Sequence, residues 1–257
     1  MKMRSVPGVQ TVLWFAGLVA ALASTVNAAT ISLNPVADTF VSSANPANNY
    51  GGAGALEVSA VGLANGEFQS LLEFNLSSAE SSFNSTYGVG DWTVQSVSLQ
   101  LTATPPNNGI FNTSAAGQFA VSWMQNDSWV EGTGTPNSPS ATGLTYNTLP
   151  SFLSVNDQAA GGFSFSGSTS ATASYSLSLV SGLVGGVTSG SLASLRLSAT
   201  DSVMSGLFDS RSFGTVGDRP VLTITAVPEP STWVLAVVGA SGLALMRGRF
   251  VVARAKP

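Results

Sequence analysis

Residues 29–226 consist of short segments rich in Val, Leu, Phe, Thr and Ser, separated by clusters of Gly, Asn and Pro. Within the segments apolar and polar residues alternate, as in Val-Ser-Leu-Gln-Leu at 97–101. A period of two places one side chain in the core and the next in solvent, which is the pattern of a half-buried strand. Many short strands between turn signals predict a single all-β domain, an antiparallel β-sandwich. Strands are expected at residues 71–76, 94–104, 118–124, 174–179, 192–198 and 221–226.

Two segments depart from the strand pattern. Residues 180–188 carry apolar side chains at near-helical spacing despite three glycines, which predicts one or two helical turns across an end of the sandwich. Residues 126–156 form a long connection that contains three prolines. A loop of that length in a compact domain is usually functional or partly disordered.

The chain has neither His nor Cys, and only 9% of its residues are charged. Catalytic triads and metal sites built on His are therefore excluded, as are thiol nucleophiles, thiolate zinc sites and disulfides. The absence of a Lys and Arg surplus argues against a nucleic-acid partner, because there is nothing to neutralise phosphates. The fold must be held together by burial of its core.

The N-terminus has the layout of a secretory signal. Lys2 and Arg4 precede an apolar run at 11–23, and small residues follow at positions that a signal peptidase reads. We expect residues 1–28 to form a signal helix that is cut between Ala28 and Ala29. The alternative is a buried or membrane-spanning N-terminal helix, although the run is shorter than the ~20 residues that span a bilayer.

The C-terminus carries Pro228-Glu229-Pro230, an apolar run at 233–246 and then a basic cluster. Prolines on both sides of an acid should end the last strand, so the domain is expected to stop near residue 226. The basic residues are Arg247, Arg249, Arg254 and Lys256.

This order of motifs in segment 227–257 resembles a PEP-CTERM sorting signal. The resemblance implies a hydrophobic helix that anchors the protein transiently in the inner membrane of a Gram-negative bacterium secreting exopolysaccharide. An exosortase-type membrane enzyme would then cut near Pro-Glu-Pro. The alternative is a permanent C-terminal anchor.

A second resemblance covers almost all of residues 29–226. The chain resembles a DNRLRE-type domain in seven short motifs that occur in the family's order. They lie at 37–41, 48–51, 70–77, 129–133, 143–147, 208–211 and 219–223. The resemblance implies a jelly-roll-like sandwich that is non-catalytic and in some members is a carbohydrate-binding module. Gln69, Tyr146 and Ser212 depart from the family's usual Arg, Trp and Glu.

Catalysis is not expected. A glycosidase needs two carboxylates that face each other across a sugar cleft, and Asp127 with Glu131 is the closest acidic pair near aromatic residues. A lyase needs a cationic or Tyr base beside the uronate, but residues 29–226 contain no Lys. The three arginines there are interpreted as structural, with Arg211 paired to Asp209, and Arg219 to Asp218 or Asp201.

Aromatic residues suggest where a sugar could bind, because flat rings match the C–H faces of sugars. Trp129 and Tyr146 flank the long loop, and each fits either a ligand platform or the core. Trp123 lies on a regular strand, where the core is favoured. Candidate polar partners of the ligand are Asn126, Asp127, Glu131 and Asn147.

Residues 29–226 hold twelve acids against three arginines, a net charge of −9. Such a domain should repel an anionic polysaccharide unless a divalent cation bridges the two. No cofactor is expected, but a structural or bridging calcium ion fits the charge. The sequence therefore favours an exported matrix protein that binds extracellular polysaccharide, either a neutral one or one bound through calcium. The alternatives are a structural or protein-interaction domain without sugar affinity and, third, an exopolysaccharide hydrolase or lyase.

Overall fold

The computed structural model describes residues 27–106 and 109–229. Residues 1–26 of the predicted signal helix lie outside the described residues. The predicted sorting helix also lies outside them, together with Pro230, Arg247 and Arg249. Ala28 and Ala29 stand at the start of the described chain, where the first strand begins at Ala29. Within the described residues, no helix is both long and apolar enough to cross a membrane.

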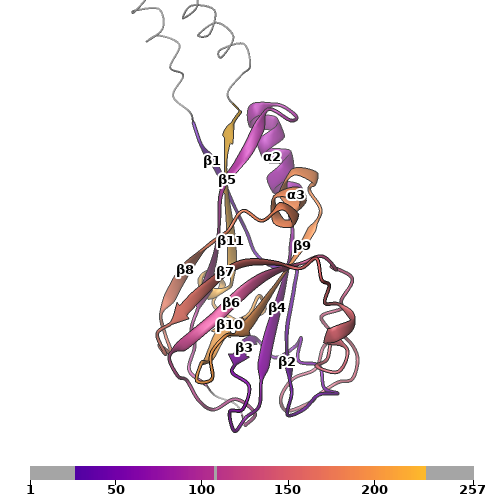
Figure 1. Cartoon of the computed structure of the whole chain (residues 1–257), viewed down its shortest axis with the longest axis vertical. Helices are drawn as coiled ribbons and strands as arrows, with labels where there is room; N and C mark the ends of the chain where they lie inside the picture. The colour runs from indigo at the N-terminus through magenta and orange to yellow at the C-terminus, as the bar shows by residue number, and fades with distance from the viewer. Residues whose placement is uncertain (1–26, 107–108, 230–257) are drawn as a thin grey trace, which may run out of the picture.

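Two antiparallel sheets form the domain, as predicted (Figure 1). One is four-stranded, in the order β1-β11-β5-β8. The other has the order β10-β3-β4-β9-β6-β7, and β2 pairs with β4 beside this path. The first sheet contains β1 (Ala29–Leu33), β5 (Trp92–Thr102), β8 (Thr172–Leu177) and β11 (Val221–Pro228). The second contains β2 (Ala37–Ser42), β3 (Ala55–Ser59), β4 (Phe68–Asn75), β6 (Gly117–Met124), β7 (Gln158–Phe165), β9 (Leu192–Ala199) and β10 (Ser205–Asp209).

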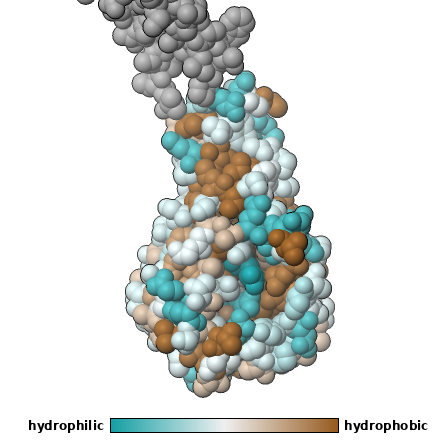
Figure 2. Space-filling view, in the orientation of Figure 1, coloured by the Kyte–Doolittle hydropathy of each residue, from teal (hydrophilic) through white to brown (hydrophobic). Residues whose placement is uncertain are grey.

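The main core fills the space between the two sheets. Both sheets contribute alternate apolar side chains to it, among them Leu99 and Ile224 from the four-stranded sheet and Leu72 and Leu197 from the other. Residues on the opposite face of the four-stranded sheet are mostly Ser and Thr. Figure 2 shows polar and apolar residues intermixed over the face in view, with an apolar patch towards the narrow end and others lower down.

Two helices lie at the narrow end of the sandwich, where the described chain also begins and ends (Figure 1). Helix α3 (Ser181–Ser189) confirms the helix expected at 180–188, and it buries Leu183 and Val187 in the core. Helix α2 (Ser77–Tyr87) was not predicted, because its Ser-rich sequence buries only Ala79 and Phe83.

The end of the last strand differs from the prediction. Strand β11 continues through Pro228 instead of stopping at 226. Pro228 lies opposite Trp92 in the ladder, and the backbone N–H of Glu229 still donates to the carbonyl of Asp91 at 2.9 Å. A proline at the end of a strand lacks only its own N–H, so the pairing survives there.

The structure describes the whole of the long segment 126–156, which follows a defined path. It packs on the outer face of the seven-stranded sheet and contains a short 3-10 helix, η1 (Leu149–Ser151). A second 3-10 helix, η2 (Val216–Asp218), precedes β11. The long segment covers Val41 of β2, while residues 110–115 cover β10 through Phe111 and Thr113, and β2, β3 and β10 are buried on both faces.

Candidate functional site

Trp129 anchors the long segment to the sheet. Its ring belongs to a second core with Val41, Leu71 and Leu144, and its Nε1–H donates to the Ser194 hydroxyl at 2.8 Å. Only 5% of Trp129 is exposed. Of the two interpretations that the sequence left open, the structure shows the core position, and the ring offers no face to a sugar.

Tyr146 lies half-buried at the rim of this second core. Its hydroxyl donates to Glu67 Oε2 at 2.6 Å, and this hydrogen bond raises the pKa of Tyr146 to about 12. Glu67 Oε1 accepts from Gln69, whose Oε1 accepts from Arg196 Nη1 at 3.0 Å. Tyr146 therefore begins a chain of polar contacts that leads to Arg196 on β9.

The predicted polar partners mostly hold backbone in place. Asn126 Oδ1 accepts from the backbone N–H of Ser128, and Asp127 Oδ1 accepts from the N–H of Ser194 at 2.8 Å. Asn147 is exposed, and its backbone N–H donates to Pro46. Neither Trp129 nor Tyr146 shares a hydrogen bond with any of these three side chains in the described part of the chain.

Glu131 forms an ion pair with Arg211, which corrects the expected pair of Arg211 with Asp209. Arg211 Nε donates to Glu131 Oε1 at 2.7 Å, and Nη2 donates to Oε2. Asp209 ends β10 and accepts from the Thr104 hydroxyl, whereas Arg211 already belongs to the turn that follows. The long segment brings Glu131 to that turn from 80 residues away in the sequence.

The expected pairing of Arg219 is also wrong. Arg219 Nε donates to the carbonyl of Phe213 at 2.8 Å, and the described residues contain no ion pair between it and Asp218 or Asp201. Asp201 instead accepts from the backbone N–H groups of the turn before β10, at Val203 and Met204.

Asp38 on β2 joins the Glu131–Arg211 pair. Its Oδ2 accepts from the backbone N–H of Arg211 at 2.6 Å, while its own N–H donates to Glu131 Oε1 at 3.0 Å. Only 1% of Asp38 is exposed, and burial raises its pKa to about 7. Burial also raises the pKa of Glu73 on β4 to about 7, with the charges of Asp127 and Glu131 acting in the same direction.

Asn49 ties the loop after β2 to the long segment. Its Nδ2 donates to the carbonyls of Glu131 and Leu144, both at 2.7 Å, and its Oδ1 accepts from the N–H groups of Gly51 and Gly134. The two backbones approach so closely that a Cβ on Gly134 would stand 1.9 Å from the carbonyl oxygen of Asn49. Only glycine fits at that crossing.

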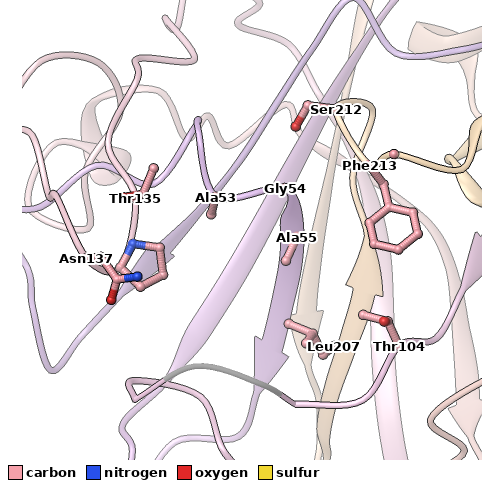
Figure 3. Close-up of a pocket in the computed structure, with 11 residues that line it drawn as sticks. Ala53, Gly54, Ala55, Thr104, Thr135, Asn137, Leu207, Ser212 and Phe213 are labelled. Carbon is pink, nitrogen blue, oxygen red and sulfur yellow. The ribbon is translucent and has the colours of Figure 1, made fainter.

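A cavity of about 560 Å³ lies between the surfaces that these contacts hold together. Figure 3 shows Ala55, Leu207, Thr104 and Phe213 on one side and the segment with Asn137 on the other. Chain segments far apart in the sequence line it, at 53–55, 104, 135–137, 207 and 212–214.

The lining combines apolar and neutral polar groups. Phe213 is a half-buried ring, and Pro136 and Leu207 add apolar surface. The lining also includes the side-chain amide of Asn137 and hydroxyl groups, which can donate and accept hydrogen bonds. Among the described residues, no charged side chain lines the cavity, and its volume is in the range of small-molecule sites. The hydroxyl groups belong to Thr104, Thr135 and Ser212.

None of the ligand-binding candidates named from the sequence lines this cavity, although the long segment reaches it through residues 135–137. Trp129 belongs to the second core, which shares no residue with the cavity lining. Phe213 was missed because no local pattern distinguishes a turn residue that faces a cavity from one that faces solvent.

Asp209 lies close to this cavity. Burial raises its pKa to about 6, and the charge of Asp218 acts in the same direction, while the hydrogen bond from Thr104 opposes them. The described residues contain no group of three or more His, Cys, Asp or Glu side chains placed to hold a metal ion.

Of the comparisons with known proteins, one family model matches part of the chain. No curated protein matches the chain. Residues 29–156, which are 128 of the 257, match the model of Carbohydrate-binding module family 96. The match includes cavity segments 53–55, 104 and 135–137, and it supports a domain of the carbohydrate-binding-module type in this chain.

Proposed function

We propose that this protein is an exported, non-catalytic polysaccharide-binding protein and that the cavity in Figure 3 holds part of the glycan. One observation carries the proposal: an uncharged cavity with an aromatic ring and neutral hydrogen-bonding groups, in a domain whose first part matches a carbohydrate-binding module. The ring of Phe213 would pack on the C–H face of a sugar. Asn137 and Thr135 would bind the hydroxyls at its rim.

The contacts behind the cavity suit this role because they preorganise it. Arg211 directly precedes wall residues 212–214, and Glu131 precedes residues 135–137 by four positions. Their ion pair fixes both walls before ligand arrives, so binding costs little ordering entropy. The neutral lining and the net charge of −9 on residues 29–226 favour a neutral glycan, or one bound with the help of a cation.

Export and sorting form the second part of the proposal. Signal peptidase would cut between Ala28 and Ala29, just before β1. An exosortase-type enzyme would cut near Pro228-Glu229-Pro230 after transient anchoring in the inner membrane, which places the domain at the surface or in the extracellular matrix of a Gram-negative bacterium. Mass spectrometry of the secreted protein should find residues 29–226 without residues 233–257. A secreted form that retains residues 233–257 contradicts the sorting proposal.

Retention on insoluble or immobilised neutral polysaccharides tests the binding function. Wild type should be retained, and Phe213→Ala and Asn137→Ala should each reduce the affinity about tenfold or more. Phe152→Ala is the matched control, since Phe152 lines a different cavity of about 360 Å³. No reducing ends should be released. Failure of wild type to bind any glycan favours a structural matrix role, whereas release of reducing ends favours an enzyme.

A further inference from the structure

The carboxylate of Asp209 is buried and incompletely satisfied. Only 2% of the residue is exposed, and Oδ1 has no hydrogen-bond partner in the described part of the chain. The hydrogen bond from Thr104 therefore reaches Oδ2. A bare carboxylate oxygen in the interior is costly, because it has lost water and gained no donor.

No cation of the described chain compensates this charge. Asp218 lies near enough to oppose the ionisation of Asp209. The two nearest arginines in sequence are used elsewhere, Arg211 by Glu131 and Arg219 by the carbonyl of Phe213. The groups that act on the Asp209 carboxylate therefore include a second carboxylate and a hydroxyl, both of which carry oxygen atoms that can bind a cation.

The position of Asp209 relates it to the cavity. Leu207 and Asp209 lie on the same face of β10, because side chains alternate along a strand. Leu207 lines the cavity, and so does Thr104, whose backbone N–H donates to the carbonyl of Leu207 at 3.0 Å. Asp209 therefore lies two residues along β10 from Leu207, which lines the proposed sugar site.

We propose that Asp209 and Asp218, with the Thr104 hydroxyl, hold a calcium ion beside the cavity. Calcium prefers carboxylate, hydroxyl, carbonyl and water oxygens and accepts irregular geometry with six to eight ligands. Protein side chains supply only some of these ligands here, so water completes the shell in the free protein. Two carboxylates predict weak affinity, with a Kd of about 10⁻⁴–10⁻³ M, as in extracellular modules.

Sugar hydroxyls would replace some of these water ligands when a glycan occupies the cavity. This step rests on the proposed function, whereas the ion site itself does not. Calcium would then tighten glycan binding, and by linkage the glycan would tighten calcium binding by the same factor. The acidic domain would thereby gain the positive charge that its own lining lacks.

Thermal unfolding of the full chain in EGTA and in 10 mM CaCl₂ tests the ion site without any sugar. Wild type should gain about 3–10 °C in Tm, given the expected Kd. Asp209→Asn should lose this gain, and its Tm in EGTA should equal or exceed that of wild type, because the uncompensated charge is gone. Asp218→Asn should reduce the gain, and Asp91→Asn, at an exposed position at the other end of the domain, should keep it.

The absence of a calcium effect on wild type, or an equal effect on Asp209→Asn, overturns the ion site. Glycan retention with and without calcium separates this result from the proposed function. If wild type is retained on glycan equally with and without calcium, the sugar site stands and the bridging role of calcium is contradicted. If calcium raises the Tm but the protein is retained on no glycan, the ion site stands and the sugar site is contradicted.

Discussion

Arg211 and Glu131 form a two-pronged ion pair that connects the two walls of the cavity, with Nε and Oε1 2.7 Å apart. The wall that contains Phe213 directly follows Arg211, and the wall that contains Asn137 follows Glu131. Asp38 supports both partners from β2 through backbone hydrogen bonds. The pair therefore joins two walls of the cavity that come from distant parts of the sequence.

Removal of one partner should therefore affect both stability and binding. Arg211→Ala leaves Glu131 next to Asp38 without a cation, and we expect a loss of about 1–3 kcal/mol in the free energy of unfolding. This lies between the values for exposed and buried pairs, since the side chains are 36% and 17% exposed. Urea unfolding measures it. Arg211→Lys keeps the positive charge but cannot form both hydrogen bonds of the guanidinium, so its free energy of unfolding should fall less than that of Arg211→Ala. Equal losses for the two variants would contradict the proposed ion pair.

Trp129 should matter for stability alone. Trp129→Phe keeps most of the buried ring but removes the hydrogen bond to Ser194, so we expect a loss of about 1–3 kcal/mol. The folded variant should bind glycan as wild type does in the retention assay. A folded Trp129→Phe protein that no longer binds would restore the interpretation of Trp129 as a sugar platform.

The glycine at the crossing of loop and segment should not tolerate a side chain. Gly134→Ala places a methyl group against the carbonyl of Asn49 and should separate the two backbones, with a loss of several kcal/mol and of glycan binding. Gly217→Ala is the matched control, because a Cβ there meets nothing within 4 Å. Chemical unfolding of both variants measures the difference, and equal stability contradicts the close approach.

The protein should be more stable at pH 5 than at pH 8 when calcium is chelated. Asp38 and Glu73 have pKa values of about 7 in the fold, compared with ordinary values of 3.8 and 4.5. Between these limits the folded state binds more protons than the unfolded state, so stability is lost as pH rises towards 7 and above. Thermal unfolding in EGTA across this range should show Tm falling by several degrees. Asp38→Asn should flatten the curve, and an unchanged slope contradicts the assignment.

The sequence pattern identified six of the strands, and the spacing of residues 180–188 identified α3. Five strands of the described chain were missed, among them β1 and β7, which do alternate in burial. The other three, β2, β3 and β10, are buried on both faces beneath covering segments. A strand without an exposed face has no period of two to detect.

The site was less predictable than the fold. Loop length and aromatic residues directed attention to the long segment, but the burial of Trp129 depends on a sheet face formed by Val41 and Leu71, far away in sequence. The partner of Arg211 was missed for a similar reason, since Glu131 is distant in the chain while Asp209 is two residues away. Local proximity is a poor guide once a loop crosses the end of a strand.

Hydrogen exchange of the full chain, with and without a retained polysaccharide, tests the location of the site most directly. We predict slower exchange of the backbone amides of residues 53–55, Thr135, Asn137 and residues 212–214, which line the cavity. Exchange around Tyr146 and Arg196, on the outer face of the seven-stranded sheet, should not change. Protection confined to that outer face, with none at the cavity, would contradict the account.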